Sequence, residues 1–503
     1  MQIIIIGAGV IGAAIARELS RYDIDIKLLE KEPDVADGTS KANSGIIHAG
    51  YNADANTLKG TMNVKSNPTY DQLCEDLKVP FKRNGSLVVG FNDEDLKKLK
   101  VKKENGEKNG IEGLEILNRE ELFKKEPNIN KKAQYALYAP SAGIISPYEL
   151  TIGYADNAVR NGAEVLLNTE VEDLIIKEGK VTGVITNRGN YQADLVINSA
   201  GLYSDKVAKM AGDKFEITPR KGEYHLFDKV HGDLVNNTLF PMPTEKSKGI
   251  LVLPTVHGNL LIGPNANIID DKNDFSTTSD GLEKVFEGAK KLVPSVPEDG
   301  IITSFSGLRA SLPSNDFHIG FSENKKALIN LVGIQSPGLS SAPAIAEKIT
   351  EMVNQYFKNN NMEIKLKDDF IENNPSYPHY HRYEENDEVE KWQNVVEKNE
   401  DYGEIICRCE HVSRGEIIDA IHRPVPARTI DAIKRRTRAS SGRCQAGFCG
   451  PRILNILSNQ LDIDPLEVTK KGRDSKILKA KSKELIIKDI NEEDNVGDKN
   501  ESI

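Results

Sequence analysis

The sequence predicts an α/β protein with a Rossmann-type domain, an inserted mixed antiparallel sheet and a small C-terminal cysteine-ligated domain. The first thirty residues read as strand, helix and strand. Residues 76–140 and 215–300 carry short strands with frequent Pro and Gly and lack this rhythm, which is typical of an antiparallel insertion. Four of the five cysteines lie between Cys407 and Cys449, and this clustering indicates a set of metal ligands.

A glycine-rich turn joins the first predicted strand to the first predicted helix. Residues 2–6 are a nearly continuous isoleucine run, and residues 10–19 repeat apolar side chains at helical spacing. A second strand ends at Glu30, an acid positioned to accept hydrogen bonds from ribose hydroxyls. The turn itself, GAGVIG at residues 7–12, fits G-x-G-x-x-G in the context that a dinucleotide site needs. Its glycines permit a tight turn, close approach of a pyrophosphate and helix–strand packing, in the order Gly7, Gly9 and Gly12.

Composition excludes several classes of function. The chain has 503 residues, 38% of them hydrophobic and 28% charged, which predicts two or three globular domains. The formal net charge of -10 argues against a general nucleic-acid binder. No stretch of eighteen apolar residues occurs, so we expect no direct membrane span. The N-terminal apolar run is too short for a signal peptide, and a cytoplasmic location is the expectation.

Three further segments resemble the FAD-dependent amine and hydroxy-acid oxidoreductase family, which includes D-amino acid oxidase and glycine oxidase. They are NSGIIHAG at 43–50, GLR at 307–309 and GIQSPGL at 333–339. The resemblance covers residues 1 to about 360, and a glycine-bearing strand end at 197–201 also favours FAD over NAD. It implies that the 333–339 turn lies along the flavin, where the dipole of the next helix stabilises the anionic reduced ring. The residues expected to contact FAD are Gly7, Gly9, Gly12, Glu30, Ser44, Gly45, Val171, Ala200, Gly201, Gly338 and Leu339.

Oxidation of an alcohol or amine by a flavin also needs a base and a cation beside the substrate. Arg309 is the candidate cation, because a guanidinium binds a carboxylate or phosphate through two hydrogen bonds; the alternative is a surface arginine before a turn. His48 is the candidate base, and a histidine that only packs against the flavin is the alternative. The segment KGEYH resembles the family segment over the substrate and adds Tyr224 and His225 as candidates.

The C-terminal cysteines form the pattern C-x-C…C-x4-C. Four thiolates suit either zinc or an iron–sulfur cluster, although zinc ribbons usually show C-x2-C in both halves. The surrounding residues resemble the bacterioferritin-associated-ferredoxin type of domain, which implies a [2Fe-2S] cluster held by Cys407, Cys409, Cys444 and Cys449. We expect the arginines at 435–438 to offset the negative charge of the thiolates or to form a docking patch for an acidic electron partner.

The predicted division of the chain follows from these segments. An FAD-binding domain is discontinuous, and two blocks between its parts form a substrate domain. A polar linker arm leads to the [2Fe-2S] domain, and a charged tail ends the chain. The expected bounds are 1–75, 141–214 and 301–364 for the FAD-binding domain, 76–140 and 215–300 for the substrate domain, 365–403 for the linker arm, 404–475 for the [2Fe-2S] domain and 476–503 for the tail.

Together these parts resemble anaerobic glycerol-3-phosphate dehydrogenases, which implies oxidation of glycerol 3-phosphate to dihydroxyacetone phosphate. Electrons would leave through the cluster to an accepting protein subunit, and any membrane contact would be made through such a partner. The same segments resemble L-2-hydroxyglutarate dehydrogenase, so a small 2-hydroxy acid is the alternative substrate. A non-catalytic flavin and iron–sulfur redox relay is the alternative of another class.

Overall fold

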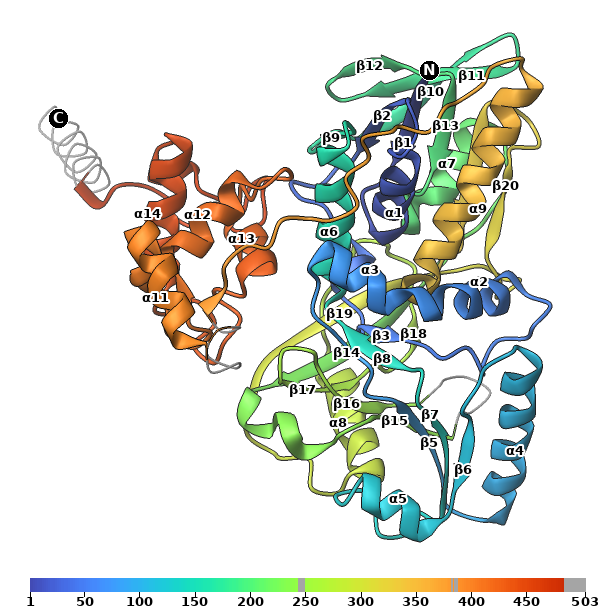
Figure 1. The fold of residues 1–503 in the computed structure, drawn as a ribbon, viewed down its shortest axis with the longest axis vertical. Helices are drawn as coiled ribbons and strands as arrows, with labels where there is room; N and C mark the ends of the chain where they lie inside the picture. Colours follow the sequence, from blue (N-terminus) through green and yellow to red (C-terminus); the bar gives the residue numbers. More distant parts are fainter. Residues whose placement is uncertain (243–248, 381–382, 384–387, 484–503) are drawn as a thin grey trace, which may run out of the picture. The chain divides into compact units, whose positions relative to one another are not determined.

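The structure, a computed structural model, describes residues 1–242, 249–380, 383 and 388–483 (Figure 1). It divides into two compact units at the bond between Ser376 and Tyr377. Most of the predicted charged tail, residues 484–503, lies outside the described residues.

The first strand lies inside a six-stranded sheet with the order β20-β21-β13-β1-β2-β9. Five of these strands are parallel, and only the edge strand β20 runs antiparallel to its neighbour. Buried parallel strands are continuously apolar, as the isoleucine run of β1 is. The strand bounds are Gln2–Ile6 for β1, Asp25–Leu29 for β2, Glu164–Leu166 for β9, Leu195–Asn198 for β13, His318–Phe321 for β20 and Leu328–Val332 for β21.

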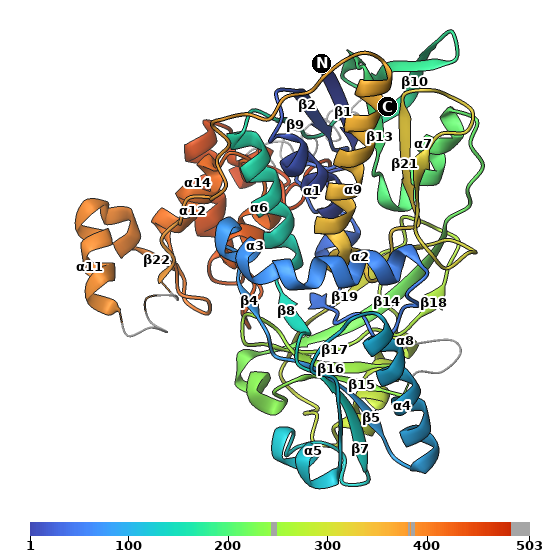
Figure 2. The same ribbon diagram turned by 45° about the vertical axis from the view of Figure 1, so that its right-hand side comes forward.

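Helices cover one face of this sheet and a small second sheet covers the other. Figure 2 shows α1 (Val10–Leu19), α6 (Pro147–Arg160) and α9 (Gly338–Asn359) side by side, and α1 contacts both of the others. Ile4 and Ile6 of β1 pack on the opposite face with side chains of the three-stranded sheet. That sheet contains the predicted hairpin and one strand that sequence reasoning missed: β10 (Val171–Lys177), β11 (Lys180–Thr186) and β12 (Gly189–Gln192).

The substrate region is built on a nine-stranded mixed sheet. Its order is β18-β14-β17-β16-β15-β5-β7-β6, with β19 paired to β14. Helix α8 (Ser279–Leu292) packs its apolar side on the part of the sheet formed by β14–β17. Helix α4 (Asp93–Lys108) contacts β5 and β7. The strands are Ser86–Gly90 (β5), Glu115–Leu117 (β6), Tyr135–Ala139 (β7), Thr218–Phe227 (β14), Thr238–Pro241 (β15), Leu251–Pro254 (β16), Leu260–Gly263 (β17), Asn267–Ile268 (β18) and Ile301–Ser311 (β19).

Short elements connect the two large sheets. A three-stranded sheet pairs β3 (Ile46–Ile47) with β8 (Gly143–Ile145), which also pairs with β4 (Phe81–Lys82). Helix α2 (Leu58–Ser66) packs against α9 and lies between the large sheets in Figure 1. The remaining helices of the first unit are α3 (Tyr70–Leu77), α5 (Arg119–Lys125) and α7 (Ser204–Met210).

Two segments lie elsewhere than the predicted division suggests. We assigned β19 to the FAD-binding domain, but it pairs along its whole length with β14 in the nine-stranded sheet. Residues 365–374, assigned to the linker arm, pack on the first unit. There the backbone N–H of Asp23 donates to the carbonyl of Lys365 at 2.8 Å, and Arg21 forms an ion pair with Glu372. Polar composition predicted a linker arm here. The contacts with the first unit join distant parts of the sequence, so local composition does not reveal them.

The second unit is a small helical domain with its own core. Apolar side chains of α12 (Arg414–His422), α13 (Ile430–Thr437) and α14 (Gly450–Leu461) pack together with Cys407 and Cys449. A capping box at Ser413 begins α12. The other elements are α11 (Val389–Lys398), β22 (Ile405–Cys407) and β23 (Val412–Ser413). In neither unit is a helix of the described residues long and apolar enough to cross a bilayer.

Candidate active site and cysteine cluster

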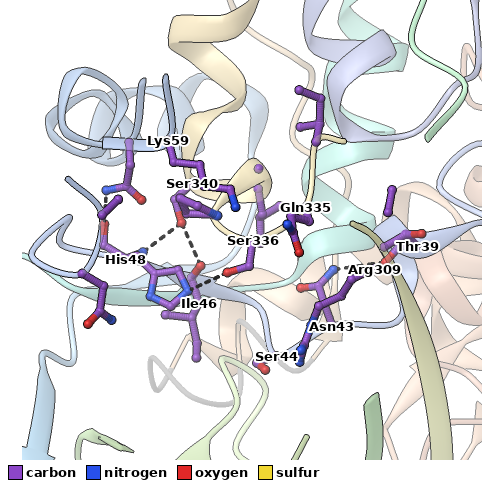
Figure 3. Close-up of a pocket in the computed structure, with 18 of the residues that line it drawn as sticks. Thr39, Asn43, Ser44, Ile46, His48, Lys59, Arg309, Gln335, Ser336 and Ser340 are labelled. Carbon is purple, nitrogen blue, oxygen red and sulfur yellow. Dashed lines mark hydrogen bonds between the residues drawn. The ribbon is translucent and has the colours of Figure 1, made fainter. Parts of the chain in front are cut away.

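A cavity of about 650 Å³ lies beside the glycine-rich turn of the first unit. Its walls come from the start of α1, the loop 39–44, β14, β19 and the start of α9 (Figure 3). The volume is in the range of cofactor and ligand sites. Segments from both large sheets therefore share one hollow, which is where a cofactor and a substrate could meet.

The glycine-rich turn is built for close approach. Gly7 has a φ of +98°, which favours glycine. A Cβ on Gly12 would lie 1.9 Å from the carbonyl oxygen of Gly7, so any larger residue would push α1 away from β1. The carboxylate of Glu30 accepts hydrogen bonds from the backbone N–H of Ala8 at 2.8 Å and of Glu32 at 3.0 Å. Burial, the largest cause, raises the pKa of Glu30 to about 7.

These features fit FAD. The helix N-terminus of α1, where the backbone N–H of Val10 donates to the hydroxyl of Ser40 at 2.9 Å, lines the cavity and can receive a pyrophosphate. A buried carboxylate with a raised pKa gains stabilisation from the hydroxyl donors of a ribose. The start of α9, at Gly338, also lines the cavity, so a second helix N-terminus is available to a flavin ring. We expect residues at both helix starts to hold the cofactor when it binds.

His48 is held in place by hydrogen bonds to its backbone. Its N–H donates to the hydroxyl of Ser340 at 2.9 Å. Its carbonyl accepts from the side-chain amides of Asn63 at 2.9 Å and Asn67 at 3.0 Å. The imidazole Nε2 lies 3.4 Å from the hydroxyl of Ser336 and the ring lines the cavity (Figure 3). A titratable ring is therefore fixed at the cavity wall, as a general base must be.

Three cationic side chains line the same cavity. Arg309 on β19 and Arg220 on β14 are partners in the strand register, so both project from the same face of the sheet. Lys59 near the start of α2 is buried, and its ammonium donates to the side-chain oxygen of Asn315 at 3.2 Å. The pKa of Lys59 is lowered to about 8, chiefly by burial; the charge of Asp316 opposes this change and the charge of Arg220 adds to it. Such a cluster favours an anionic ligand.

Sequence reasoning found only Arg309 of these three cations. Arg220 is four residues before Tyr224 on one strand, and side chains at even spacing share a face of a strand. This period could have found Arg220. No comparable signal marks Lys59, because its approach to the cavity depends on how α2 packs.

The expectation for Tyr224 and His225 is right in placement for only one of them. Tyr224 lines the cavity and stacks on Phe305 with ring centroids 4.8 Å apart. His225 projects from the opposite face: its Nδ1 lies 2.8 Å from the hydroxyl of Ser304, and its Nε2 lies 3.3 Å from the carbonyl of Leu282 in α8. Adjacent residues of a strand point to opposite faces, so His225 lies outside the cavity lining, and its role in the site stays a prediction.

The structure gathers about half of the expected first-unit residues at the cavity. Gly7, Gly12 and Glu30 lie in the turn behind it, and Gly45, Val171 and Ala200 lie outside its lining. Their contacts with FAD stay predictions. The expected residues that line the cavity are Gly9, Ser44, His48, Gly201, Tyr224, Arg309, Gly338 and Leu339.

The four cysteines of the second unit approach one another in two pairs. The sulfurs of Cys409 and Cys444 are 3.6 Å apart, and the thiol of Cys407 is hydrogen-bonded to Cys449. That bond from Cys407 is the largest cause that lowers the pKa of Cys449, to about 6. The described residues contain no group of three or more His, Cys, Asp or Glu side chains placed to hold one metal ion. Two thiol pairs fit a [2Fe-2S] cluster, whose two irons take four cysteine ligands.

A tight loop brings these pairs together. A Cβ on Gly442 would lie 2.3 Å from the Cβ of Cys409, so only glycine lets the loop before Cys444 pass this close. Cys407 and Cys449 are each 1% exposed, whereas Cys444 is exposed. The pair of Cys409 and Cys444 therefore marks the side of the site that faces solvent.

The arginine run at 435–438 does not form the expected docking patch. Arg435 and Arg436 are buried, and Arg436 donates to the carbonyls of Val425 at 3.0 Å and Ala432 at 3.1 Å. Arg438 forms an ion pair with Glu410 at 2.8 Å. The arginine side chains are therefore engaged within the domain: Arg435 and Arg436 lie on the buried side of α13, and Arg438 follows its last turn.

The fold and the two sites define a class of protein. The FAD dependent oxidoreductase family matches residues 2–352, and the BFD-like [2Fe-2S] binding domain matches residues 405–459. The chain belongs to the FAD dependent oxidoreductase family and carries a BFD-like [2Fe-2S] domain in addition. The flavoprotein and cluster expectations are thereby confirmed.

Particular relatives narrow the class. The chain is 46% identical over 483 residues to a glycerol 3-phosphate dehydrogenase of Caloramator mitchellensis, covering 96% of this chain and 99% of the relative. A solved structure of L-alpha-glycerophosphate oxidase from Mycoplasma pneumoniae with FAD bound matches with a TM-score of 0.69 and 31% identity, over 75% of this chain and 99% of that one. Human L-2-hydroxyglutarate dehydrogenase is 26% identical, over 71% of this chain and 89% of its own.

Proposed function

We propose that this protein oxidises glycerol 3-phosphate to dihydroxyacetone phosphate and delivers the electrons to a one-electron protein acceptor. One turnover removes a hydride from C2 of the substrate and a proton from its hydroxyl. Two molecules of acceptor are each reduced by one electron, and two protons are released. FAD, when bound, supplies the two-electron acceptor at the substrate, and a [2Fe-2S] cluster supplies the one-electron exit.

The observation that carries the proposal is the convergence of Lys59, Arg220 and Arg309 with one imidazole, His48, on a single cavity. A phosphate monoester carries close to two negative charges at neutral pH, so it satisfies several cations better than a single carboxylate does. The glycerol 3-phosphate dehydrogenase and glycerophosphate oxidase relatives support the same substrate.

The roles of individual residues follow from what each can reach. Arg309 and Arg220 bind the phosphate from the face of β14 and β19, and Lys59 adds a third charge from α2. His48 accepts the hydroxyl proton of the substrate as the C–H bond breaks. Tyr224, stacked on Phe305, limits the cavity beside the glycerol carbons.

An accepting protein subunit is part of the proposal. The BFD-like domain gives the chain an exit for single electrons. The oxidase relative matches 75% of this chain along 99% of its own length, so it has no counterpart of this domain. Any contact with a membrane would be made through such a subunit.

Anaerobic bleaching of the flavin tests the proposal. The FAD-loaded protein is mixed with glycerol 3-phosphate, with L-2-hydroxyglutarate and with amino acids in separate stopped-flow runs. We expect rapid loss of flavin absorbance with glycerol 3-phosphate alone. Bleaching only by L-2-hydroxyglutarate would replace the substrate with a hydroxy acid, and no bleaching by any of them would favour the non-catalytic relay.

A matched pair of variants locates the phosphate site. Arg220→Gln removes one cavity cation, and Lys206→Gln removes an exposed lysine of α7 outside the cavity lining. Loss of a charge-assisted hydrogen bond costs about 1.5–3 kcal/mol, which is roughly a 10- to 100-fold rise in KM. Lys206→Gln is expected to leave KM unchanged. An unchanged KM in Arg220→Gln would show that the phosphate binds elsewhere.

A further inference from the structure

The second unit carries an exposed cationic and aromatic surface beside its exposed cysteine. Arg408 lies between the first two cysteines, and Phe448 and Arg452 lie on either side of the last one. The guanidinium of Arg408 lies 4.5 Å from the centre of the Phe448 ring, and that of Arg452 lies 5.0 Å from it. Phe448 itself is 40% exposed. We call Arg408, Phe448 and Arg452 the exit surface.

The guanidinium charges of Arg408 and Arg452 are available to a partner. Within the described residues, no carboxylate is close enough to Arg408 or Arg452 to form an ion pair, and both stack on Phe448 instead. By contrast, Arg438 is already paired with Glu410 in the interior. The surrounding chain has a net charge of -10, so this positive region differs in sign from the protein as a whole.

The exit surface also lies where an electron would leave. Cys407 and Cys449 are buried in the core of the unit, whereas Cys444 is exposed and pairs with Cys409. Arg408 is bonded in sequence to Cys409, and Arg443 to Cys444. A cluster on these four sulfurs would have its most accessible edge at this surface, and electron transfer needs the shortest path between donor and acceptor.

We infer that the exit surface docks a small redox protein that presents an acidic patch around its own redox centre. An aromatic side chain between two arginines is the composition of an interface centre, where aromatic residues and Arg are enriched. Electron-transfer partners form small, weak interfaces that rely on charge for encounter, and a patch of three side chains suits that class. The inference rests on the proposed function, because it needs electrons to reach the cluster from a substrate.

Binding can be measured apart from turnover. The full chain, loaded with FAD and iron, is titrated into a ¹⁵N-labelled acidic blue-copper protein held in its reduced state, and NMR shifts are followed. A basic cytochrome c of comparable size serves as the opposite-charge probe. We expect shifts confined to the acidic patch of the copper protein, weakened as salt shortens the Debye length. Equal or stronger binding of the cytochrome would overturn the inference.

Variants assign the binding to these residues. Arg408→Gln with Arg452→Gln removes two charges, and Phe448→Ala removes the ring between them. Lys471→Gln is the matched control, because Lys471 is an exposed cation of the same unit that is not part of the exit surface. Its segment contacts the N-terminal end of α13. We expect the double variant to weaken binding and to lower the second-order rate of copper reduction about tenfold at low salt, with Lys471→Gln unchanged.

Two further readouts separate this inference from the proposed function. Flavin bleaching and appearance of the reduced-cluster signal after addition of glycerol 3-phosphate are measured in each variant. If neither occurs in the unmodified protein, the proposed function fails. If both occur but the double variant transfers electrons and binds normally, only the exit surface is wrong. If the double variant slows reduction of its own cluster, the surface serves the first unit of the same chain, and the inference is also overturned.

Discussion

Hydrogen bonds to its backbone hold His48 at the cavity wall. Both its N–H and its carbonyl are bonded to side chains from α2, the turn after it and α9. Its Nε2 lies 3.4 Å from the hydroxyl of Ser336. A substitution at this position therefore removes the proton acceptor without disturbing the bonds that hold the segment.

The first prediction concerns this proton acceptor. His48→Gln is expected to lower kcat for glycerol 3-phosphate about 10²- to 10⁴-fold, the usual contribution of a general base. Flavin content and absorbance should be unchanged. Single-turnover flavin reduction measures the effect, and a kcat within a factor of three of the unmodified protein would show that another group takes the proton.

Lys59 gives the site a pH dependence. Its pKa is lowered to about 8, chiefly by burial, so its ammonium loses its charge as pH rises through that value. The substrate phosphate is already a dianion there, because its second pKa is near 6. Attraction between the Lys59 ammonium and the substrate phosphate therefore weakens above pH 8. We predict that KM for glycerol 3-phosphate rises above this pH.

Two variants in α2 test the predicted rise of KM above pH 8. Lys59→Met should give a raised KM that no longer changes between pH 7 and 9. Lys65→Met removes an exposed lysine of the same helix that pairs with Glu347, and it should keep the rise above pH 8. A KM profile that is the same in Lys59→Met and in the unmodified protein would contradict the role of Lys59.

At the scale of elements, the contact between β1 and α1 is sensitive to substitution at Gly12. Gly12→Ala would place a methyl group against the carbonyl of Gly7, and overpacking of this kind costs about 1–3 kcal/mol. We predict loss of most bound FAD on purification and a lower Tm. Gly38→Ala is the control, since a Cβ there meets no atom within 4 Å. Equal FAD content in the two variants would show that the turn does not hold the cofactor.

Sequence periodicity predicted individual helices and strands better than it predicted which strands pair. The strand–helix–strand start, the hairpin at 181–193 and the helix of residues 389–396 are all present, because each depends on local spacing. The pairing of β14 with β19 joins segments about eighty residues apart, and it alone brings Arg220 beside Arg309. Register between strands is set by long-range packing, so the pairing of Arg220 with Arg309 was not predicted, although the period of two within β14 puts Arg220 and Tyr224 on one face and His225 on the other.

At the scale of the whole molecule, the motifs predicted the two kinds of cofactor site but not the surfaces around them. G-x-G-x-x-G and C-x-C…C-x4-C are local patterns whose chemistry fixes their spacing. The side on which an arginine lies depends on helix packing, so the sequence left open whether the run at 435–438 offsets the thiolate charge or forms a docking patch. In the structure Arg435 and Arg436 are buried. Arg408, Arg443 and Arg452 are exposed, and each lies within three residues of a cysteine in the sequence.

The central claim is that electrons from glycerol 3-phosphate reach iron held by four cysteines of the same chain. Electron paramagnetic resonance of the anaerobic protein, frozen after addition of glycerol 3-phosphate, tests it most directly. We predict the signal of a reduced [2Fe-2S] cluster, present in the unmodified protein and absent in Cys444→Ser, while the flavin is bleached in both. A bleached flavin with no cluster signal in protein that contains iron would contradict the account.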